Sequence, residues 1–441
     1  MWGYSVERRL IGVAFAATVA AVLPSTGAQA AGYGVGYDSV AATAVAGAGG
    51  GAAAGDASTA YFNPAAMMRL NRSQVSAGAH LVVPRIDFTN YGTRSRNGVL
   101  VPGNDGGDGG EDAAVPYIHG VWVVNPHTRL GLSINSPYGL VTSWDGGFVG
   151  RYNELTTALK TVNVNPSVAY QLSPQLSVGG GVSAVYGRAR LSQGIDFGAA
   201  LGLGDTTQDG SGEFGGTDIS YGFNLGFLYQ FTPATRVGVH YRSEVRFEFD
   251  GEAKFQVPAA ARAALNGAGM PRAFTNGGGS TTLPLPEQLS ASGFHQLNER
   301  WAVMGDVTWT RWSVFDELRF NFDEPQTSAN VIATQWKNVF RYAAGATYEW
   351  SPKWQLRGGV HYDDSPVDTR FRGVGVPDSD RIGTAIGAGY KLSDRVSLDF
   401  AYQHLFFKDG NATQRNGANS RVMGQIEASA DIVGVGLTWK F

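Results

Sequence analysis

Charged side chains recur at alternate positions along several segments, and their types could bind a carboxylate ligand or one another. Within 237–250, the hydrophobic residues Val239, Tyr241 and Phe247 are predicted to share one face. Charged residues take the opposite face, here and in later segments, and we interpret them as pointing inward. The set is Arg242, Glu244, Arg246, Glu248, Arg357, His361, Asp363 and Lys391. Because both signs are mixed, a mutually neutralising network is favoured over a dedicated carboxylate site.

The sequence indicates no metal site, cofactor or enzyme active site. Its seven histidines include no H-x-x-x-H spacing and it has no cysteine, so zinc binding is not indicated. No G-x-S-x-G nucleophile motif is present. Gly47–Ala52 matches a G-x-G-x-x-A fingerprint, but no βαβ pattern surrounds it. The Asp/Gly-rich segment 104–112 could hold calcium, but it lacks EF-hand spacing and is interpreted as an acidic surface loop.

The composition and the first thirty residues place the chain outside the cytoplasm. Arg8 and Arg9 precede the apolar run Leu10–Leu23, and Ala28-Gln29-Ala30 is a small-x-small cleavage site. We therefore predict a signal peptide over 1–30; a membrane anchor would need about 20 apolar residues. A net charge of −3 argues against nucleic acid as a partner. The 61 glycines and 12% aromatic residues favour many strands over many helices.

Strand-like alternation is the main structural signal in the rest of the chain. In Ile219–Phe231 every second residue is aromatic or aliphatic, and small or polar residues dominate the positions between them. The C-terminal residues Val433–Phe441 show the same pattern and end on an aromatic residue. Such a pattern is typical of strands with one face toward lipid and the other toward a lumen.

Turn signals divide the alternating segments in a regular way. Short turns are predicted at Asn125-Pro126, Ser173-Pro174, Thr232-Pro233, Asn298-Glu299, Ser351-Pro352 and Ser393-Asp394. Longer polar or Gly-rich stretches lie between them, at about 91–113, 142–156, 193–216, 251–284, 323–335, 364–379 and 410–427. Six turns that alternate with seven loops predict a closed, all-β membrane fold over 73–441. We expect a 14-stranded antiparallel transmembrane β-barrel with both ends on the turn side.

The block 31–72 fits neither a strand nor a spanning helix. It contains Ala41–Gly55, which is almost entirely Ala and Gly, followed by the Asn63-Pro64-Ala65 motif. Small residues allow close backbone packing, so we expect a compact plug inside the barrel. A disordered periplasmic tail is the alternative.

Several short motifs, taken in order, resemble the FadL/OmpP1/TodX family of outer-membrane transporters of hydrophobic compounds. They are Asp56–Ala65, Ser136–Leu140, Gly150–Tyr152, Tyr241–Val245, Leu285–Glu287, Trp309–Ser313, Asp363–Val367 and Pro377–Arg381. The resemblance covers essentially the whole mature chain, and it rests on the ordered set because no single motif is decisive. It implies a fourteen-stranded barrel, in agreement with the strand count, and an N-terminal hatch carrying Asn63, Pro64 and Ala65.

The resemblance also implies a lateral exit at an inward kink of the third strand, which maps to Pro137, Tyr138 and Gly139. Pro cannot donate to a ladder and Gly marks bends in barrel strands, so the residue types agree. Alternatively, Pro137 begins the second extracellular loop. By resemblance, Tyr33 lies in the substrate pocket near the mature N-terminus. Gln193 departs from the family because a fatty-acid member carries an arginine there.

The predicted function is passive transport of long-chain fatty acids or aromatic or aliphatic hydrocarbons across the Gram-negative outer membrane by a monomer. Expected partners are the hydrophobic solute and outer-membrane lipid and lipopolysaccharide. One alternative is a general porin for small hydrophilic solutes. The other is a barrel phospholipase, for which His404, beside Phe406 and Phe407, is the candidate residue.

Overall fold

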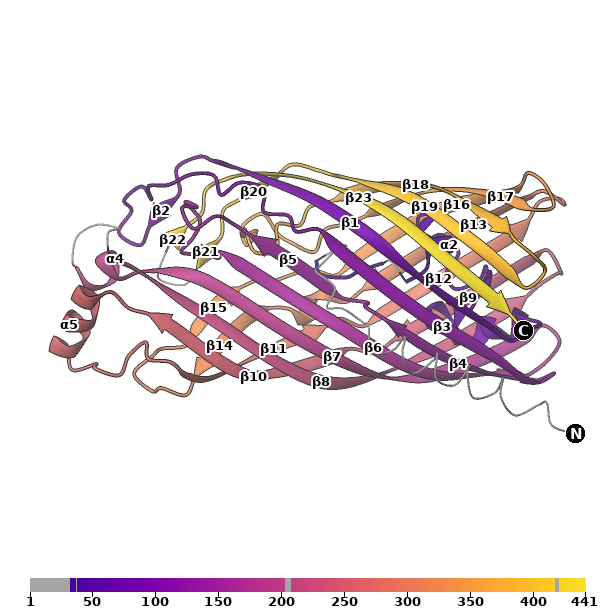
Figure 1. Cartoon of the computed structure of the whole chain (residues 1–441), viewed down its shortest axis with the longest axis horizontal. Helices are drawn as coiled ribbons and strands as arrows, with labels where there is room; N and C mark the ends of the chain where they lie inside the picture. Colours follow the sequence, from indigo (N-terminus) through magenta and orange to yellow (C-terminus); the bar gives the residue numbers. More distant parts are fainter. Residues whose placement is uncertain (1–31, 37, 203–207, 417–419) are drawn as a thin grey trace, which may run out of the picture.

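A computed structural model describes residues 32–36, 38–202, 208–416 and 420–441 of the chain; the predicted signal peptide 1–30 and Ala31 lie outside the described residues. The chain forms a closed antiparallel barrel of fourteen tilted strands, as predicted (Figure 1). Six of these strands are interrupted and carry two labels. Among the described residues, no helix has the length and hydropathy needed to cross a membrane.

The wall strands follow one another in chain order. They are β1 (Gln74–Asn90), β3 (Ala113–Asn125), β4 and β5 (Thr128–Asn135, Gly139–Ser143), β6 (Thr156–Gln171), β7 (Leu176–Asp196), β8 (Asp209–Gln230), β9 and β10 (Thr235–Arg242, Val245–Gln256), β11 and β12 (Gly277–Leu285, Gln288–Gln296), β13 and β14 (Trp301–Thr310, Glu317–Phe322), β15 and β16 (Asn330–Ala333, Val339–Glu349), β17 (Trp354–Asp363), β18 (Arg381–Lys391), β19 with the short β20 (Val396–Phe407, Gly410–Ala412) and β23 (Gly424–Lys440).

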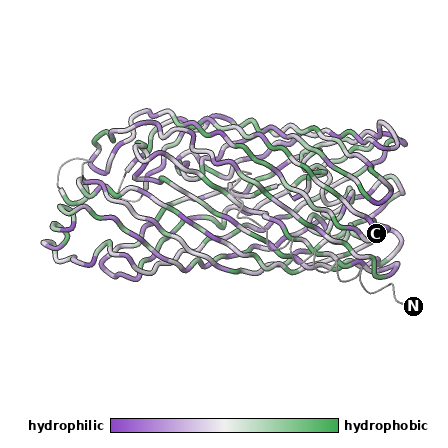
Figure 2. Tube along the Cα trace, in the orientation of Figure 1, coloured by the Kyte–Doolittle hydropathy of each residue, from purple (hydrophilic) through white to green (hydrophobic). Residues whose placement is uncertain are grey.

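The barrel is closed by pairing between its first and last strands. β1 and β23 pair from Gln74–Lys440 to Asn90–Gly424, so the edges that these two strands turn toward each other are paired along their whole length. Hydrophobic and hydrophilic residues alternate along the strands (Figure 2). On β8, Tyr221 and Leu225 are exposed on the outer face whereas Asn224 is fully buried, which matches the predicted alternation.

The two ends of the barrel differ as predicted, although the loops are shorter than expected. All six predicted tight turns connect neighbouring strands. At the opposite end, β7 and β8 extend into the predicted loop 193–216, and α4 (Phe197–Leu201) lies between them. The predicted loop 251–284 contains parts of β10 and β11 and the helix α5 (Ala259–Gly267), which the sequence analysis missed. Figure 1 shows α4 and α5 at the end farthest from the C-terminus.

Small elements complete this loop end. The strands β2 (Arg94–Ser95), β21 (Arg415–Asn416) and β22 (Ser420–Arg421) form a separate three-stranded sheet. The strand β15 and the start of β23 lie within two other stretches predicted as loops, 323–335 and 410–427. The predicted loop 364–379 separates β17 from β18, as expected.

The predicted inward direction of Arg246 and Glu248 is wrong. On β10, Phe247 and Phe249 are fully buried in the lumen, and Arg246 and Glu248 are exposed on the outer face. The side-chain phase changes at the break between β9 and β10, where Arg242 and Ser243 are both buried. Because neighbouring residues of a continuous strand point to opposite faces, one break reverses every side chain beyond it.

The N-terminal segment, defined as residues 38–72, lies inside the barrel. It contains α2 (Val40–Thr43), α3 (Thr59–Phe62) and the 3-10 helix η1 (Pro64–Arg69). The helix α2 contacts β18, β19, β23 and β1, whereas η1 contacts β4, β6, β7 and β8. The segment therefore touches widely separated parts of the wall.

Candidate functional site

Asn63 ties the N-terminal segment to the barrel wall. It is fully buried, and its Nδ2 donates to the carbonyls of Gly51 (2.8 Å) and Phe227 (3.0 Å). Its Oδ1 accepts from the amide of Ala65 (3.1 Å), so Asn63 also caps η1, whose first residue is Pro64. The Ala65 carbonyl accepts from Ser177 on β7 (3.0 Å). The motif thus joins two parts of the segment to β7 and β8.

Inward arginines bind main-chain carbonyls of the N-terminal segment. Arg236 donates to Ala52 and Ala53, and Arg341 donates to Ala46. Arg242 donates to the carbonyl of Tyr61 (2.9 Å), and its guanidinium lies 3.8 Å from the centre of the Tyr61 ring. An Ala/Gly segment has few side chains to satisfy its own backbone, so the wall supplies the donors. Sequence reasoning missed this role.

Glycines of the wall make this close packing possible. A Cβ at Gly238 would overlap the carbonyl of Gly51, and a Cβ at Gly359 would overlap the backbone of Val45. Both positions face the lumen, where the N-terminal segment lies directly against the strands. The high glycine content therefore reflects backbone contact between wall and segment as well as turns.

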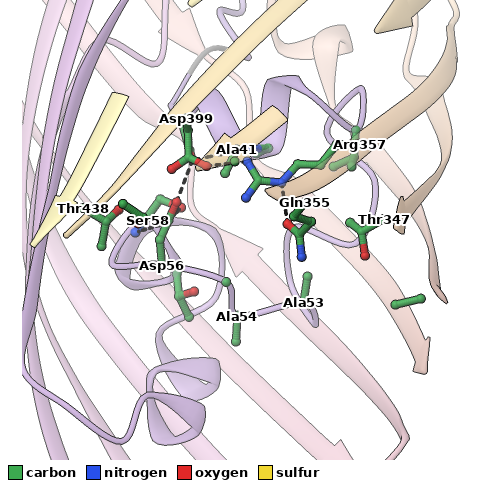
Figure 3. Close-up of a pocket in the computed structure, with 18 of the residues that line it drawn as sticks. Ala41, Ala53, Ala54, Asp56, Ser58, Thr347, Gln355, Arg357, Asp399 and Thr438 are labelled. Carbon is green, nitrogen blue, oxygen red and sulfur yellow. Dashed lines mark hydrogen bonds and ion pairs between the residues drawn. The ribbon is translucent and has the colours of Figure 1, made fainter. Parts of the chain in front are cut away.

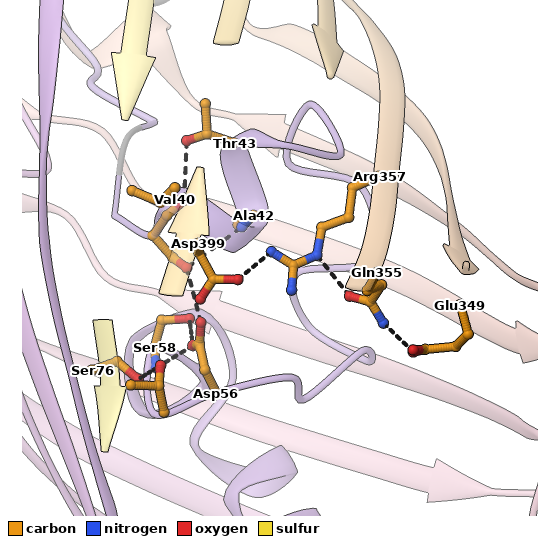
Figure 4. Close-up of polar contacts among 12 residues, drawn as sticks. Val40, Ala42, Thr43, Asp56, Ser58, Ser76, Glu349, Gln355, Arg357 and Asp399 are labelled. Atoms are coloured by element: carbon orange, nitrogen blue, oxygen red, sulfur yellow. Dashed lines mark hydrogen bonds and ion pairs between the residues drawn. The ribbon is translucent and has the colours of Figure 1, made fainter. Parts of the chain in front are cut away.

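A polar network lies at the turn end of the lumen (Figure 4). Asp56 accepts from the Ser58 amide (2.8 Å) and from Ser39 Oγ (3.2 Å), and the Ala57 amide donates to Ser76 on β1 (3.2 Å).

Nearby, Arg357 forms an ion pair with Asp399 (2.5 Å) and donates to Gln355 (2.7 Å), as Figure 4 also shows. These side chains line a cavity of about 540 Å³ that also contacts the turns around Glu349 and Asp394 (Figure 3). The cavity is lined by these polar side chains and by alanines and other residues of the N-terminal segment. Lys391, predicted to point inward, lies on its rim with a 60% exposed side chain.

Tyr33 lies at the centre of an aromatic cluster in the loop half of the lumen. Its ring centre is 4.7 Å from that of Trp312 and 5.6 Å from those of Phe315 and Trp336. Its hydroxyl donates to the carbonyl of Pro284 (2.7 Å). Burial raises the pKa of Tyr33, so the hydroxyl remains a neutral donor.

An apolar pocket lies against one side of Tyr33. It has a volume of about 50 Å³, and its lining includes Leu140, Leu159, Phe249 and Leu283. The reversed side-chain direction on β10 places Phe249 here, and Phe247 packs in the same hydrophobic cluster. None of the described lining residues is charged. The pocket suits an apolar group, and it is small beside typical ligand sites of roughly 300–1,000 Å³.

The third strand is interrupted at Ser136–Tyr138, between β4 and β5, and its free edge pairs with the N-terminus. The Val35 amide donates to Pro137 (2.7 Å) and the Gly139 amide donates to Tyr33 (2.9 Å), which leaves Gly34 opposite Tyr138. The ladder between the second and third strands ends at Ile118–Ile134. Residues 33–35 therefore take the position beside the break that a neighbouring wall strand would otherwise hold.

A second cavity, of about 180 Å³, reaches the break from the lumen. Its lining includes Gly34, Pro137 and Tyr138, together with Asp38 and Arg242. Asp38 accepts a hydrogen bond from Asn135 (2.5 Å), and burial raises its pKa to about 7. Tyr33 and Tyr138 lie between this cavity and the apolar pocket, with ring centres 6.2 Å apart.

The other candidate residues lie away from this site or are engaged elsewhere. Gln193, near the loop end of β7, accepts from Asn330 (3.4 Å). His404 faces outward and pairs with Asp431 (2.7 Å).

Three further predictions concern charged groups. In the segment 104–112, Asp108 accepts from Arg85 and from the amides of Ile86 and Gly110. Among the described residues, no group of three His, Cys, Asp or Glu side chains is placed to hold a metal ion. Asp363 is inward as predicted and forms a buried ion pair with Arg381 (2.8 Å), and His361 is also buried.

Comparisons with known proteins agree with this architecture. The family model described as "Outer membrane protein transport protein (OMPP1/FadL/TodX)" matches residues 21–441. A long-chain fatty acid transport protein of Escherichia coli O6:H1 is 30% identical over 449 residues, which cover 97% of this chain and 98% of that protein.

Solved structures share the fold. A Pseudomonas aeruginosa FadL homologue has a TM-score of 0.88 at 24% identity, covering 93% of this chain and all 100% of that one. The Ralstonia pickettii toluene transporter TbuX has a TM-score of 0.64 at 20% identity, covering 90% and 98%. The chain belongs to the OMPP1/FadL/TodX family and is an outer-membrane transport protein.

Proposed function

We propose that this protein carries small hydrophobic molecules, namely long-chain fatty acids or aromatic or aliphatic hydrocarbons, passively across the outer membrane. Its relatives include a long-chain fatty acid transport protein and a toluene transporter, which supports this solute class. The main structural support is the apolar pocket at Tyr33, because that residue also pairs with the break in the third strand. The proposal includes no catalytic step.

The proposed route begins at the loop end and reaches the apolar pocket between Leu140, Phe249 and Leu283. The pocket is too small for a whole solute, so occupancy has to displace Tyr33. That movement breaks the hydrogen bonds of residues 33–35 to Pro137 and Gly139, and uncovers the edge of the third strand. The solute then leaves sideways into the bilayer. Lateral exit avoids water, where each exposed CH₂ costs about 0.8 kcal/mol.

The N-terminal segment acts as a hatch in this proposal. Its anchors at Asn63 and at Arg236, Arg242 and Arg341 support a plug that stays in place while residues 33–35 move. A plugged lumen disfavours the general porin, since small hydrophilic solutes need a continuous aqueous channel. We propose that the protein works as a monomer because one barrel contains the whole route.

Transport in liposomes tests the proposal. The full mature protein is expected to speed the entry of a radiolabelled long-chain fatty acid or toluene while leaving sugar entry near the background rate. Phe249→Ala should weaken the binding of the hydrophobic solute to the protein by about tenfold, because a buried aromatic side chain contributes roughly 1.5–3 kcal/mol. Phe406→Ala is the control, since Phe406 is an outward aromatic residue that is 54% exposed. Rapid sugar entry with no effect on hydrophobic solutes would contradict the proposal.

A further inference from the structure

Two cations stand directly opposite each other on the outer wall. Lys160 on β6 pairs in register with Arg188 on β7, strands that lie side by side in Figure 1. Both point outward, because their neighbours Leu159 and Ala189 are buried and line the apolar pocket. Directly opposed residues of an antiparallel pair have Cβ atoms about 5 Å apart, and like charges at that separation destabilise the pair.

Three other outward arginines form ion pairs with carboxylates, whereas Lys160 and Arg188 do not. Arg190 pairs with Glu213 (3.0 Å), Arg246 with Glu244 (2.9 Å) and Arg85 with Asp108 (3.2 Å). Within the described part of the chain, no acidic side chain lies within ion-pair distance of Lys160 or Arg188. The pair is thus a local excess of positive charge on the outer wall.

The pair lies at the outer boundary of the apolar band. Between Lys160 and the turn end of the barrel, the outward residues of β6 are Val162, Val164, Pro166, Val168 and Tyr170. On β7, the outward positions between Arg188 and the turn end run from Tyr186 to Val178 and are likewise apolar. Tyr170 lies ten positions after Lys160. At about 3.3 Å per residue and a tilt near 40°, this is about 25 Å, the height of the lipid-facing band.

We propose that Lys160 and Arg188 form a binding site for a phosphate group of the outer-leaflet glycolipid, lipopolysaccharide. The lipid A headgroup carries phosphates at the boundary where its acyl chains end, which is the depth of this pair. A phosphate between the two side chains accepts charge-assisted hydrogen bonds from both and removes their mutual repulsion. The acyl chains then lie on the apolar outer surface below them. The inference rests on the outer-membrane location and not on the identity of the transported solute.

The bound lipid has a defined position relative to the transport site. Lys160 is also in register with Gly139 on β5, where the third strand resumes after its break. The phosphate site therefore marks the wall next to the proposed exit. Lipid binding is measured in an assay that does not involve transport. A failure of the transport proposal therefore leaves the lipid-binding proposal testable, and the reverse also holds.

Thermal unfolding of the full mature protein in detergent tests the site. Three additives are compared: lipid A with both phosphates, dephosphorylated lipid A, and the fatty acid myristate. Only phosphorylated lipid A is expected to raise the unfolding temperature. In K160Q/R188Q the concentration needed for half of this shift should rise about tenfold or more, because two charge-assisted contacts are lost. Native mass spectrometry of the same samples counts bound lipid A directly.

Arg246→Gln is the matched control, because Arg246 is an outward arginine with its own acidic partner and should respond to lipid A as the unmodified protein does. Without lipid, K160Q/R188Q should be as stable as the unmodified protein or slightly more stable, since like charges are removed. An equal response of K160Q/R188Q, or an equal effect of dephosphorylated lipid A, would overturn the proposal. A shift by myristate that depends on the pair would reassign the site to carboxylates.

Discussion

The main-chain amide of Val35 donates to the carbonyl of Pro137 over 2.7 Å, which joins the first described residues of the chain to the break in its third barrel strand. The reciprocal bond, from Gly139 to Tyr33, lies two residues away on each strand. Together they make the N-terminus a short strand that pairs with the interrupted wall. This pairing underlies the proposed coupling between the pocket and the lateral exit.

A disulfide across this pairing should lock the exit. Gly34 and Tyr138 form a non-hydrogen-bonded antiparallel pair, for which Cα atoms are about 4.5 Å apart, within the range of a disulfide. The natural chain has no cysteine, so G34C/Y138C introduces the only two thiols. Oxidation should abolish most hydrophobic uptake into liposomes, and reduction should restore it to the level of Y138C alone. Unchanged uptake by the oxidised, folded barrel would count against lateral exit.

Asn63→Ala should loosen the N-terminal segment without unfolding the barrel. The substitution removes three hydrogen bonds of a fully buried amide, with an expected cost of about 2–4 kcal/mol. Amide hydrogen exchange within 48–66 should accelerate by roughly 30-fold or more, whereas exchange in the wall strands should stay slow. Asn321→Ala, at an exposed position of β14, serves as control. Uniform acceleration over all strands would show instead that Asn63 supports the whole barrel.

Gly238→Ala should displace the N-terminal segment by steric overlap. The added Cβ meets the Gly51 carbonyl, and overpacking of this kind costs about 1–3 kcal/mol. We expect a clear rise in ion conductance across planar bilayers. Gly293→Ala is the control, because a Cβ at Gly293 meets nothing within 4 Å. If both variants conduct as little as the unmodified protein, the segment does not obstruct the lumen at Gly51.

The packing of the long loops should weaken as pH rises. Glu154 is buried between loops, accepts a hydrogen bond from Thr157 (3.2 Å), and burial raises its pKa from 4.5 to about 7. Between these two pH values the folded state holds a proton that the unfolded state releases. The free energy of unfolding therefore falls as pH rises through this window.

Limited proteolysis of the loops at pH 5.5 and pH 8 measures this effect, with faster cleavage expected at the higher value. Glu154→Gln should reduce the difference by keeping the low-pH behaviour at both values. Part of the dependence should remain, because burial also raises the pKa of Asp378 to about 6. Cleavage that is equally pH-dependent in Glu154→Gln would assign the effect to other groups.

The sequence by itself determined the barrel, the number of its strands and its six tight turns. These features follow from local rules: side chains alternate along a strand, and Pro, Asn, Asp and Ser favour turns. Ile219–Phe231 needed no other part of the chain to show which side chains face outward. The same rules predicted a segment at 31–72 that is unlike the wall.

Only the tertiary structure decided how the wall and that segment meet. Phe247 and Phe249 line the lumen because a break at Ser243 reverses the alternation, and the sequence pattern carries no sign of that reversal. The pairing of Val35 with Pro137 and the donation from Arg341 to Ala46 join residues about one hundred and about three hundred positions apart. The alternation of hydrophobic and polar residues depends only on residues that are close together in the chain. Contacts such as these depend on where barrel closure places distant backbone groups.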